Sequence, residues 1–479
     1  MPSTVKLHHH QDNPAARLRS ADAQFWVLIA FMVIVFATGG GARPDILSLV
    51  VLRPLSFLVV GYALLLMPKG MRRKGLMPLM LLLVLAGIMG LQLMPLPPGV
   101  WMRLPGRSLI AAIENDVGIV HGWRPLSLSP SRTLNSLFSL GVPLATSLLL
   151  IGVERKRQGS ITWLLLAAGL VSTVLGLLQM IGPSHSALYA YRITNFGMPT
   201  GLFANRNHQA VFLACLYPLL AHHLIQLRNQ ETARRPMILA VLLAAAIVFL
   251  VLIVATGSRA GTALALTALL GSAALWLIAR RGQPRGPALI DRFILPAGLL
   301  MAAALLALLF LNSRTQGIDR IFRESLTGEL RWQILPVLSE LAKTYFPFGS
   351  GFGSFYLVYQ VAEPHALLQE SYLNQAHNDL LQFIIEGGLP ALVLLIAALT
   401  WFARAGWLCW LRFCRAADEG SQKLPLGPFA WLSLAVLLAA SVVDYPLRTP
   451  AIMVPGIILA HLVARSALST RFAAATNGD

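Results

Sequence analysis

Residues 375–403 read QAHNDLLQFIIEGGLPALVLLIAALTWFA, an apolar run that opens on His377, Asn378 and Asp379. The run is long enough for a helix to cross the hydrocarbon core of a bilayer. Ionisable residues are rare in such segments unless they face the protein interior or a wet cavity. The stretch therefore predicts a membrane-spanning helix whose outer end carries functional residues.

Similar apolar runs recur along the 479-residue chain, which is 56% hydrophobic and 12% charged. A soluble protein carries about 25% charged residues, and a transmembrane barrel would show alternating segments of about ten residues. The sequence predicts an all-α polytopic membrane protein, a single membrane domain over residues 1–479 with about twelve transmembrane helices. We expect the spans at 24–41, 46–67, 76–96, 134–152, 160–181, 208–227, 237–255, 260–279, 293–311, 378–403, 427–443 and 450–466.

The net charge of +18 follows the predicted topology. With the amino terminus placed inside, most of the 38 lysines and arginines lie in inner segments, such as KGMRRKG at 69–75. Basic loops stay on the cytoplasmic side of membranes. The charge thus predicts that both ends lie inside, and it does not indicate nucleic-acid binding. The three cysteines show neither a disulfide framework nor zinc-site spacing.

Two long outer loops interrupt the spans. The first, residues 97–133, is rich in proline, and the second, residues 312–376, is predicted to be partly helical. Loops of that length are usually functional. The second ends in PFGSGFGSFY at 347–356, whose glycines suit a tight turn against a flat or anionic partner, or equally a turn between elements.

Polar residues cluster at the predicted outer starts of three inward-running helices: GLFANRNHQA at 201–210, ATGSRAGTA at 255–263, and residues 375–379. Helix amino termini present N–H groups and a positive dipole end, and arginines add suitability for phosphate. If the helices are neighbours, Arg206, Arg259 and His377 converge. The alternative is that the arginines extend to lipid phosphates and that the histidine is structural.

Polar side chains also form a stripe on the helix predicted from residue 378. Asp379, Gln382 and Glu386 share one face, which predicts a cavity wall. Acidic groups near the imidazole of His377 would raise its basicity or set its tautomer; a protonated, structural Glu386 is the alternative. The GGLP sequence at 387–390 predicts a break in the helix.

Two further arginines call for partners. Arg53 lies within a predicted span, and Pro54 leaves backbone carbonyl groups unbonded that could accept from its guanidinium. Asp444 and Arg448 lie in VVDYPLRTP, between the last two spans, where we expect them to pair as a structural clasp.

Together these features resemble the bacterial O-antigen ligase and Wzy-type polymerase family of membrane glycosyltransferases. The resemblance is closest over residues 200–392, and its marks are GLFANRNHQA, TGSRAG, Arg331-Trp332 followed by PFGSGFGSF, and the His-Asn start of the tenth span. Family ligases place a glycine ten residues after the polar residue that follows the histidine, then Gly, Thr or Tyr three positions on. His377, Asn378 and Gly388 match, whereas Ala391 departs and slightly favours a polymerase or an exopolysaccharide ligase.

The resemblance implies transfer of a glycan from an undecaprenyl-diphosphate-linked donor to a sugar hydroxyl, on the periplasmic face of the bacterial inner membrane. The acceptor would be lipid A–core in a ligase or another lipid-linked glycan in a polymerase. His377 would be the general base. The expected substrate-binding residues are Arg206, Arg259, Arg331, Asn205 and Asn378. No cofactor and no metal are expected.

Two other functions remain open on the sequence. A metal-dependent polyprenyl-phosphate glycosyltransferase would need acidic ligands in the first outer loop, where Glu114 and Asp116 are the candidates, and no DxD motif occurs. A transporter or flippase of lipid-linked glycans would show matching halves and midplane sites, whereas the polar clusters lie at the outer ends of the spans.

Overall fold

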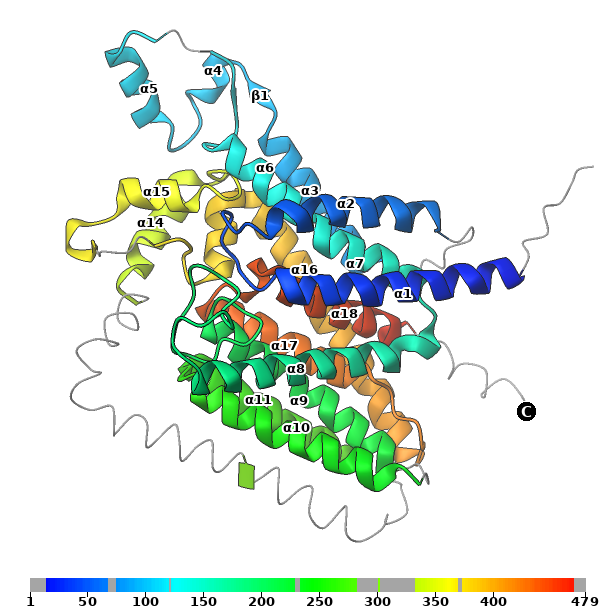
Figure 1. Ribbon diagram of the computed structural model, residues 1–479. Coiled ribbons are helices and arrows are strands. Elements are labelled where there is room, and N and C mark those ends of the chain that lie inside the picture. The colour runs from blue at the N-terminus through cyan, green and yellow to red at the C-terminus, as the bar shows by residue number, and fades with distance from the viewer. Residues whose placement is uncertain are drawn as a thin grey trace, which may run out of the picture.

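The computed structural model describes residues 14–67, 75–119, 122–228, 233–281, 300–301, 332–368 and 373–468. Over these ranges the chain is mostly helical, as predicted, and β1 (Pro95–Leu96) and β2 (Arg124–Pro125) form one short antiparallel pair. In Figure 1 the long helices lie alongside one another, and the short helices α4, α5, α14 and α15 gather at one end of the bundle.

Within the described ranges, seven helices are long and apolar enough to cross a membrane: Pro130–Gly152 (α6 with α7), Arg155–Ile181 (η1 with α8), α9 (Arg206–Arg228), α10 (Arg235–Ala255), α11 (Arg259–Ala279), α16 (Asp379–Asp418) and α18 (Pro450–Ala467). Four shorter apolar helices match further predicted spans: the apolar part of α1 (Pro14–Thr38), α2 (Leu49–Leu65), α3 (Met77–Gln92) and α17 (Gly427–Val443). The ninth predicted span, 293–311, lies almost wholly outside the described residues, so the total of twelve stays a prediction.

Helix α9 forms the centre of the bundle, and its side chains are buried along nearly its whole length. It packs against α11 and α17. A Cβ built on Gly261 would lie 2.4 Å from Cβ of Ala210, so α9 and α11 approach closely where both residues are small. Small residues at such contacts allow membrane helices to pack backbone to backbone. This contact holds the starts of α9 and α11 together.

The first outer loop is ordered. In the sequence, helices α4 (Pro98–Trp101) and α5 (Ser108–Asp116) lie between the two strands. The fully buried side chain of Arg107 stabilises this hairpin. Its guanidinium donates to the carbonyl oxygens of Pro105 at 2.7 Å, Leu126 at 2.6 Å and Gly349 at 3.1 Å. The last of these bonds joins the first outer loop to the second.

The described part of the second outer loop contains α14 (Leu335–Tyr345), α15 (Phe355–Ala362) and the short turn η2 (His365–Leu367). The glycine run before α15 packs on protein backbone. A Cβ on Gly349 would lie 2.4 Å from the carbonyl oxygen of Glu386, and one on Gly353 would lie 2.8 Å from that of Arg132. The glycine run at 347–356 therefore forms a turn between elements, which was one of its two predicted roles.

Helix α16 breaks at Gly388, as predicted. Gly388 has φ 61° and ψ −147°, a conformation open to few residues other than glycine. The break frees carbonyl oxygens, and the glycine run supplies their donors: the N–H of Ser350 bonds Ile385 at 3.0 Å and that of Gly351 bonds Glu386 at 2.9 Å. Backbone hydrogen bonds thus attach the second outer loop to α16 at its break.

Candidate functional site

A capping side chain lies at the amino terminus of each of the three helices that the sequence analysis singled out. Asn205, Ser258 and Asn378 each accept a hydrogen bond from a backbone N–H two or three residues further on, at 2.8, 3.1 and 3.0 Å. Asn195 accepts another from the N–H of Arg206 at 3.0 Å. Because capping consumes N–H groups at helix starts, fewer of them remain for an anion than we expected. The structure gives Asn205 and Asn378 a capping role, and their contact with substrate stays a prediction.

His377 stands immediately before the cap of α16 in the left-handed region, with φ 51°. Its side chain is 24% exposed, and its Nδ1 lies 3.4 Å from Oδ1 of Asp444. That nitrogen is buried and has no hydrogen bond within the described part of the chain. Nδ1 of the imidazole therefore faces a carboxylate, and Nε2 is the other ring nitrogen.

Asp444 is the residue whose role sequence reasoning missed. Its carboxylate accepts from Nδ2 of Asn207 at 3.0 Å and lies 4.0 Å from Nε2 of His208. The ring of Tyr445 lies edge-on to His208 and His377, with centroids 5.3 and 5.0 Å away. Asp444 and Tyr445 come from the turn after α17, so the groups around the imidazole come from three separate segments. An acidic residue at the outer end of a predicted span was the available signal.

Arg206 and Arg259 lie at the starts of the closely packed helices α9 and α11. Nη1 of Arg206 would be 3.5 Å from a Cβ built on Gly257, so its guanidinium lies beside the turn that precedes Arg259. Arg259 itself is exposed. The structure thus brings Arg206 next to the α11 turn and, through its neighbours Asn207 and His208, to the Asp444 cluster. Arg331 lies outside the described residues.

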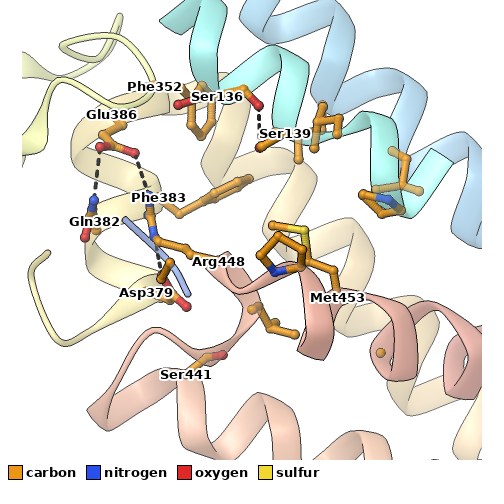
Figure 2. A pocket seen from close by; sticks show the side chains of 18 of the residues that line it. Ser136, Ser139, Phe352, Asp379, Gln382, Phe383, Glu386, Ser441, Arg448 and Met453 are labelled. Atoms are coloured by element: carbon orange, nitrogen blue, oxygen red, sulfur yellow. Dashed lines mark hydrogen bonds and ion pairs between the residues drawn. The ribbon is translucent and has the colours of Figure 1, made fainter. Parts of the chain in front are cut away.

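Arg448 makes different contacts from those expected. It lies in η3 (Pro446–Arg448), and its guanidinium reaches Asp379 at 2.6 Å and Glu386 at 3.5 Å rather than pairing with Asp444 (Figure 2). Burial lowers the pKa of Arg448, but the two carboxylates raise it more, so its pKa lies above the ordinary value. The expected clasp was wrong because the turn directs Arg448 toward α16.

The same contacts correct the expectation for the imidazole. Both acidic residues of the α16 stripe pair with Arg448, whereas the carboxylate beside His377 comes from Asp444. The stripe does face a cavity, as predicted. Gln382 donates to Glu386 at 3.0 Å, and Figure 2 shows both beside Arg448 on the cavity wall.

The cavity has a volume of about 720 Å³, within the range of ligand sites. Arg53 lines it and donates to Oδ1 of Asn135 at 2.6 Å. The partner of this intramembrane arginine is therefore a side-chain amide, and not the backbone carbonyl groups that we expected. His377, Arg206 and Arg259 are outside the lining, so the imidazole cluster and the cavity are adjacent but separate.

Two other residues that the sequence analysis considered are buried and have partners within the protein. Glu114, the acidic residue considered as a metal ligand, is buried and forms an ion pair with Arg124. Ala391, the departure from the ligase pattern, is fully buried in a cluster with Met89, Leu140 and Phe352. The residue at 391 is thus set by packing, and it gives little support for choosing between ligase and polymerase.

Part of the chain matches the model of a known protein family. Residues 244–396, which run from α10 into α16, match the family model described as O-antigen ligase. No curated protein matches the chain. The apolar helices and this match both point to a multi-pass membrane protein. Over residues 244–396 the chain is therefore similar to the O-antigen ligase family.

Proposed function

We propose that this protein transfers a glycan from an undecaprenyl-diphosphate-linked donor to a sugar hydroxyl on the periplasmic face of the inner membrane, as a ligase or a polymerase. The observation that carries the proposal is the contact of His377 with Asp444, 3.4 Å between Nδ1 and Oδ1, at the meeting point of α9, α16 and the turn after α17. A carboxylate in that position orients the imidazole ring.

The chemistry is a single displacement with His377 as general base. Nε2 accepts the proton of the acceptor hydroxyl while that oxygen bonds to the anomeric carbon of the donor sugar. The bond from the anomeric carbon to the phosphate oxygen breaks, and the diphosphate leaves with the electron pair. Asp444 stabilises the imidazolium that forms. Base assistance of this kind contributes roughly 10²–10⁴-fold to a rate.

The leaving diphosphate needs positive charge as it departs. Arg206 beside the α11 turn and the exposed Arg259 supply it, and we expect Arg331 to join them. Guanidinium groups aimed at developing charge stabilise the transition state without protonation changes. Because arginines fill this role, transfer is expected to continue in EDTA, and its loss in EDTA would favour a metal-dependent transferase.

The test replaces His377 with glutamine in the purified protein. With a labelled lipid-linked donor, His377→Gln is expected to transfer roughly 10²–10⁴-fold more slowly and to bind the donor normally, because the imidazole acts on the acceptor. His365→Gln alters an exposed histidine in η2 and serves as the control. A normal transfer rate in His377→Gln would refute the base assignment.

A further inference from the structure

The cavity beside the imidazole cluster is polar at one end and apolar over the rest of its length. Its polar end is formed by α2, α6 and the first turns of α16, including Arg53, Arg132 and Gln382. Its long apolar wall comes from α3, α16, α17 and α18, through residues such as Leu82, Leu395, Phe402, Leu438 and Ile457. Such a cavity suits an amphipathic ligand.

The apolar wall is built from several helices. On α16 the apolar lining beyond the break at Gly388 runs from Leu394 to Phe402, a helical rise of about 12 Å at 1.5 Å per residue. The exposed residue Leu399 belongs to the lining, so the wall reaches the lipid-facing surface of the bundle. A membrane lipid therefore has a direct route into the cavity.

The polar end carries positive charge that no described carboxylate neutralises. Asp379 and Glu386 are both bound by Arg448. Arg53 contacts the neutral Asn135, and its Nε is buried without a partner among the described residues. Arg132 lies over the ring of Tyr356, 4.8 Å from its centroid. Two guanidinium groups near an apolar channel call for an anionic headgroup, most simply a phosphate.

We propose that this cavity binds a second lipid-borne phosphate, that of the acceptor. Its phosphate contacts Arg53 and Arg132, and its hydrocarbon chain lies along α3, α16, α17 and α18. The inference rests on the proposed function, in which the donor diphosphate occupies the separate site of Arg206 and Arg259. The lining includes Gln375 and Asp379, which flank His377 in the chain, so sugars on this lipid lie close to the base. The acceptor is thus membrane-anchored, and not a free oligosaccharide.

Binding of two probes to the purified full-length protein tests this assignment. The probes are undecaprenyl diphosphate and hexa-acylated diphosphoryl lipid A, and native mass spectrometry gives affinity and stoichiometry. The double variant Arg53→Gln, Arg132→Gln lacks the charge-assisted contacts to the phosphate. It is expected to bind lipid A about 10–100-fold more weakly and to bind undecaprenyl diphosphate normally. Arg206→Gln with Arg259→Gln is expected to show the reverse pattern. These results identify a lipid A acceptor.

A polyprenyl-linked acceptor gives a different result. Lipid A then binds weakly to every variant, two molecules of undecaprenyl diphosphate bind the natural protein, and the Arg53 and Arg132 double variant loses one of them. Unchanged affinity and stoichiometry for both probes in that double variant would overturn the inference. If His377→Gln transferred normally while the double variant still lost a lipid, the proposed reaction would fail and the lipid site would stand.

A second variant tests the apolar wall without altering charge. Gly456 on α18 lines the cavity, and a Cβ there would have only ordinary contacts, 3.5 Å or more from its neighbours. Gly456→Leu is expected to exclude the same lipid that depends on Arg53 and Arg132. Gly87→Leu on α3, where a Cβ would meet nothing within 4 Å, is the control. Equal lipid binding in the two variants would contradict placement of the chain in this cavity.

Discussion

At the scale of the residue, the conformation of His377 stands out. Its φ of 51° lies in a region that side-chain-bearing residues seldom adopt, and such conformations cost on the order of 1–3 kcal/mol unless the surroundings hold them. Bonds on either side hold it: the N–H of Ala376 donates to Gln382 at 2.9 Å, and Asn378 caps α16. In this conformation the imidazole lies beside Asp444.

Asp444→Asn tests whether the carboxylate acts through the imidazole. The variant keeps the size of the side chain and removes its charge, so the imidazolium formed during transfer loses its stabilising partner. We expect initial rates about 10–100-fold lower, in line with the roughly 1.5–3 kcal/mol of a hydrogen bond to a charged group. Asp22→Asn, in the exposed pair with Arg157, is the matched control. Similar rates in the two variants would show that Asp444 is only structural.

At the scale of the element, the break in α16 sets the positions of the site and the cavity together. The first turns before Gly388 carry the polar stripe, and the long helix beyond it supplies part of the apolar cavity wall. The outer loops are fastened to this break through backbone bonds from the glycine run and through Arg107.

Gly388→Ala is expected to destabilise the protein strongly. A Cβ at this position would lie 2.2 Å from the carbonyl oxygen of Pro347, in a backbone conformation that also disfavours side chains. We expect a clear drop in thermal midpoint in detergent, equivalent to at least about 1–3 kcal/mol. Gly90→Ala on α3 meets nothing within 4 Å and should stabilise its helix by about 0.5–1 kcal/mol. A Gly388→Ala protein as stable as Gly90→Ala would contradict the described break.

Arg107→Met is expected to loosen the first outer loop. The substitution leaves three carbonyl oxygens without their donor, and each buried group left unsatisfied costs roughly 1–3 kcal/mol. Hydrogen exchange over residues 95–125 should speed up markedly. The exposed Arg103, changed to Met, provides the comparison. Unaltered exchange in Arg107→Met would mean that the hairpin is held by other contacts.

At the scale of the whole molecule, the orientation in the membrane remains a prediction from charge. We expect Trp123→Cys to react with an impermeant maleimide in intact spheroplasts and Lys156→Cys to react only after lysis. The background is Cys414→Ser, because Cys215 and Cys409 are buried. The opposite labelling pattern would place the imidazole cluster on the cytoplasmic side and remove the periplasmic reaction.

The sequence by itself determined the helical membrane fold, the break at Gly388 and the polar face of α16. Each depends on residues close together in the chain, because periodicity, glycine conformation and lipid exclusion of charge act locally. It also pointed to His377 through a family motif. Most of the predicted spans could be placed for the same reason, since a run of apolar side chains is itself the signal.

Only the tertiary structure decided which groups meet. Asp444 lies beside His377 although 67 positions separate them, Arg448 pairs with Asp379, and Arg53 donates to Asn135. A buried polar group accepts whichever partner lies opposite. Which helix lies opposite is set by the packing of side chains across the whole bundle, as in the close contact of α9 with α11, and no local pattern in the chain encodes that choice.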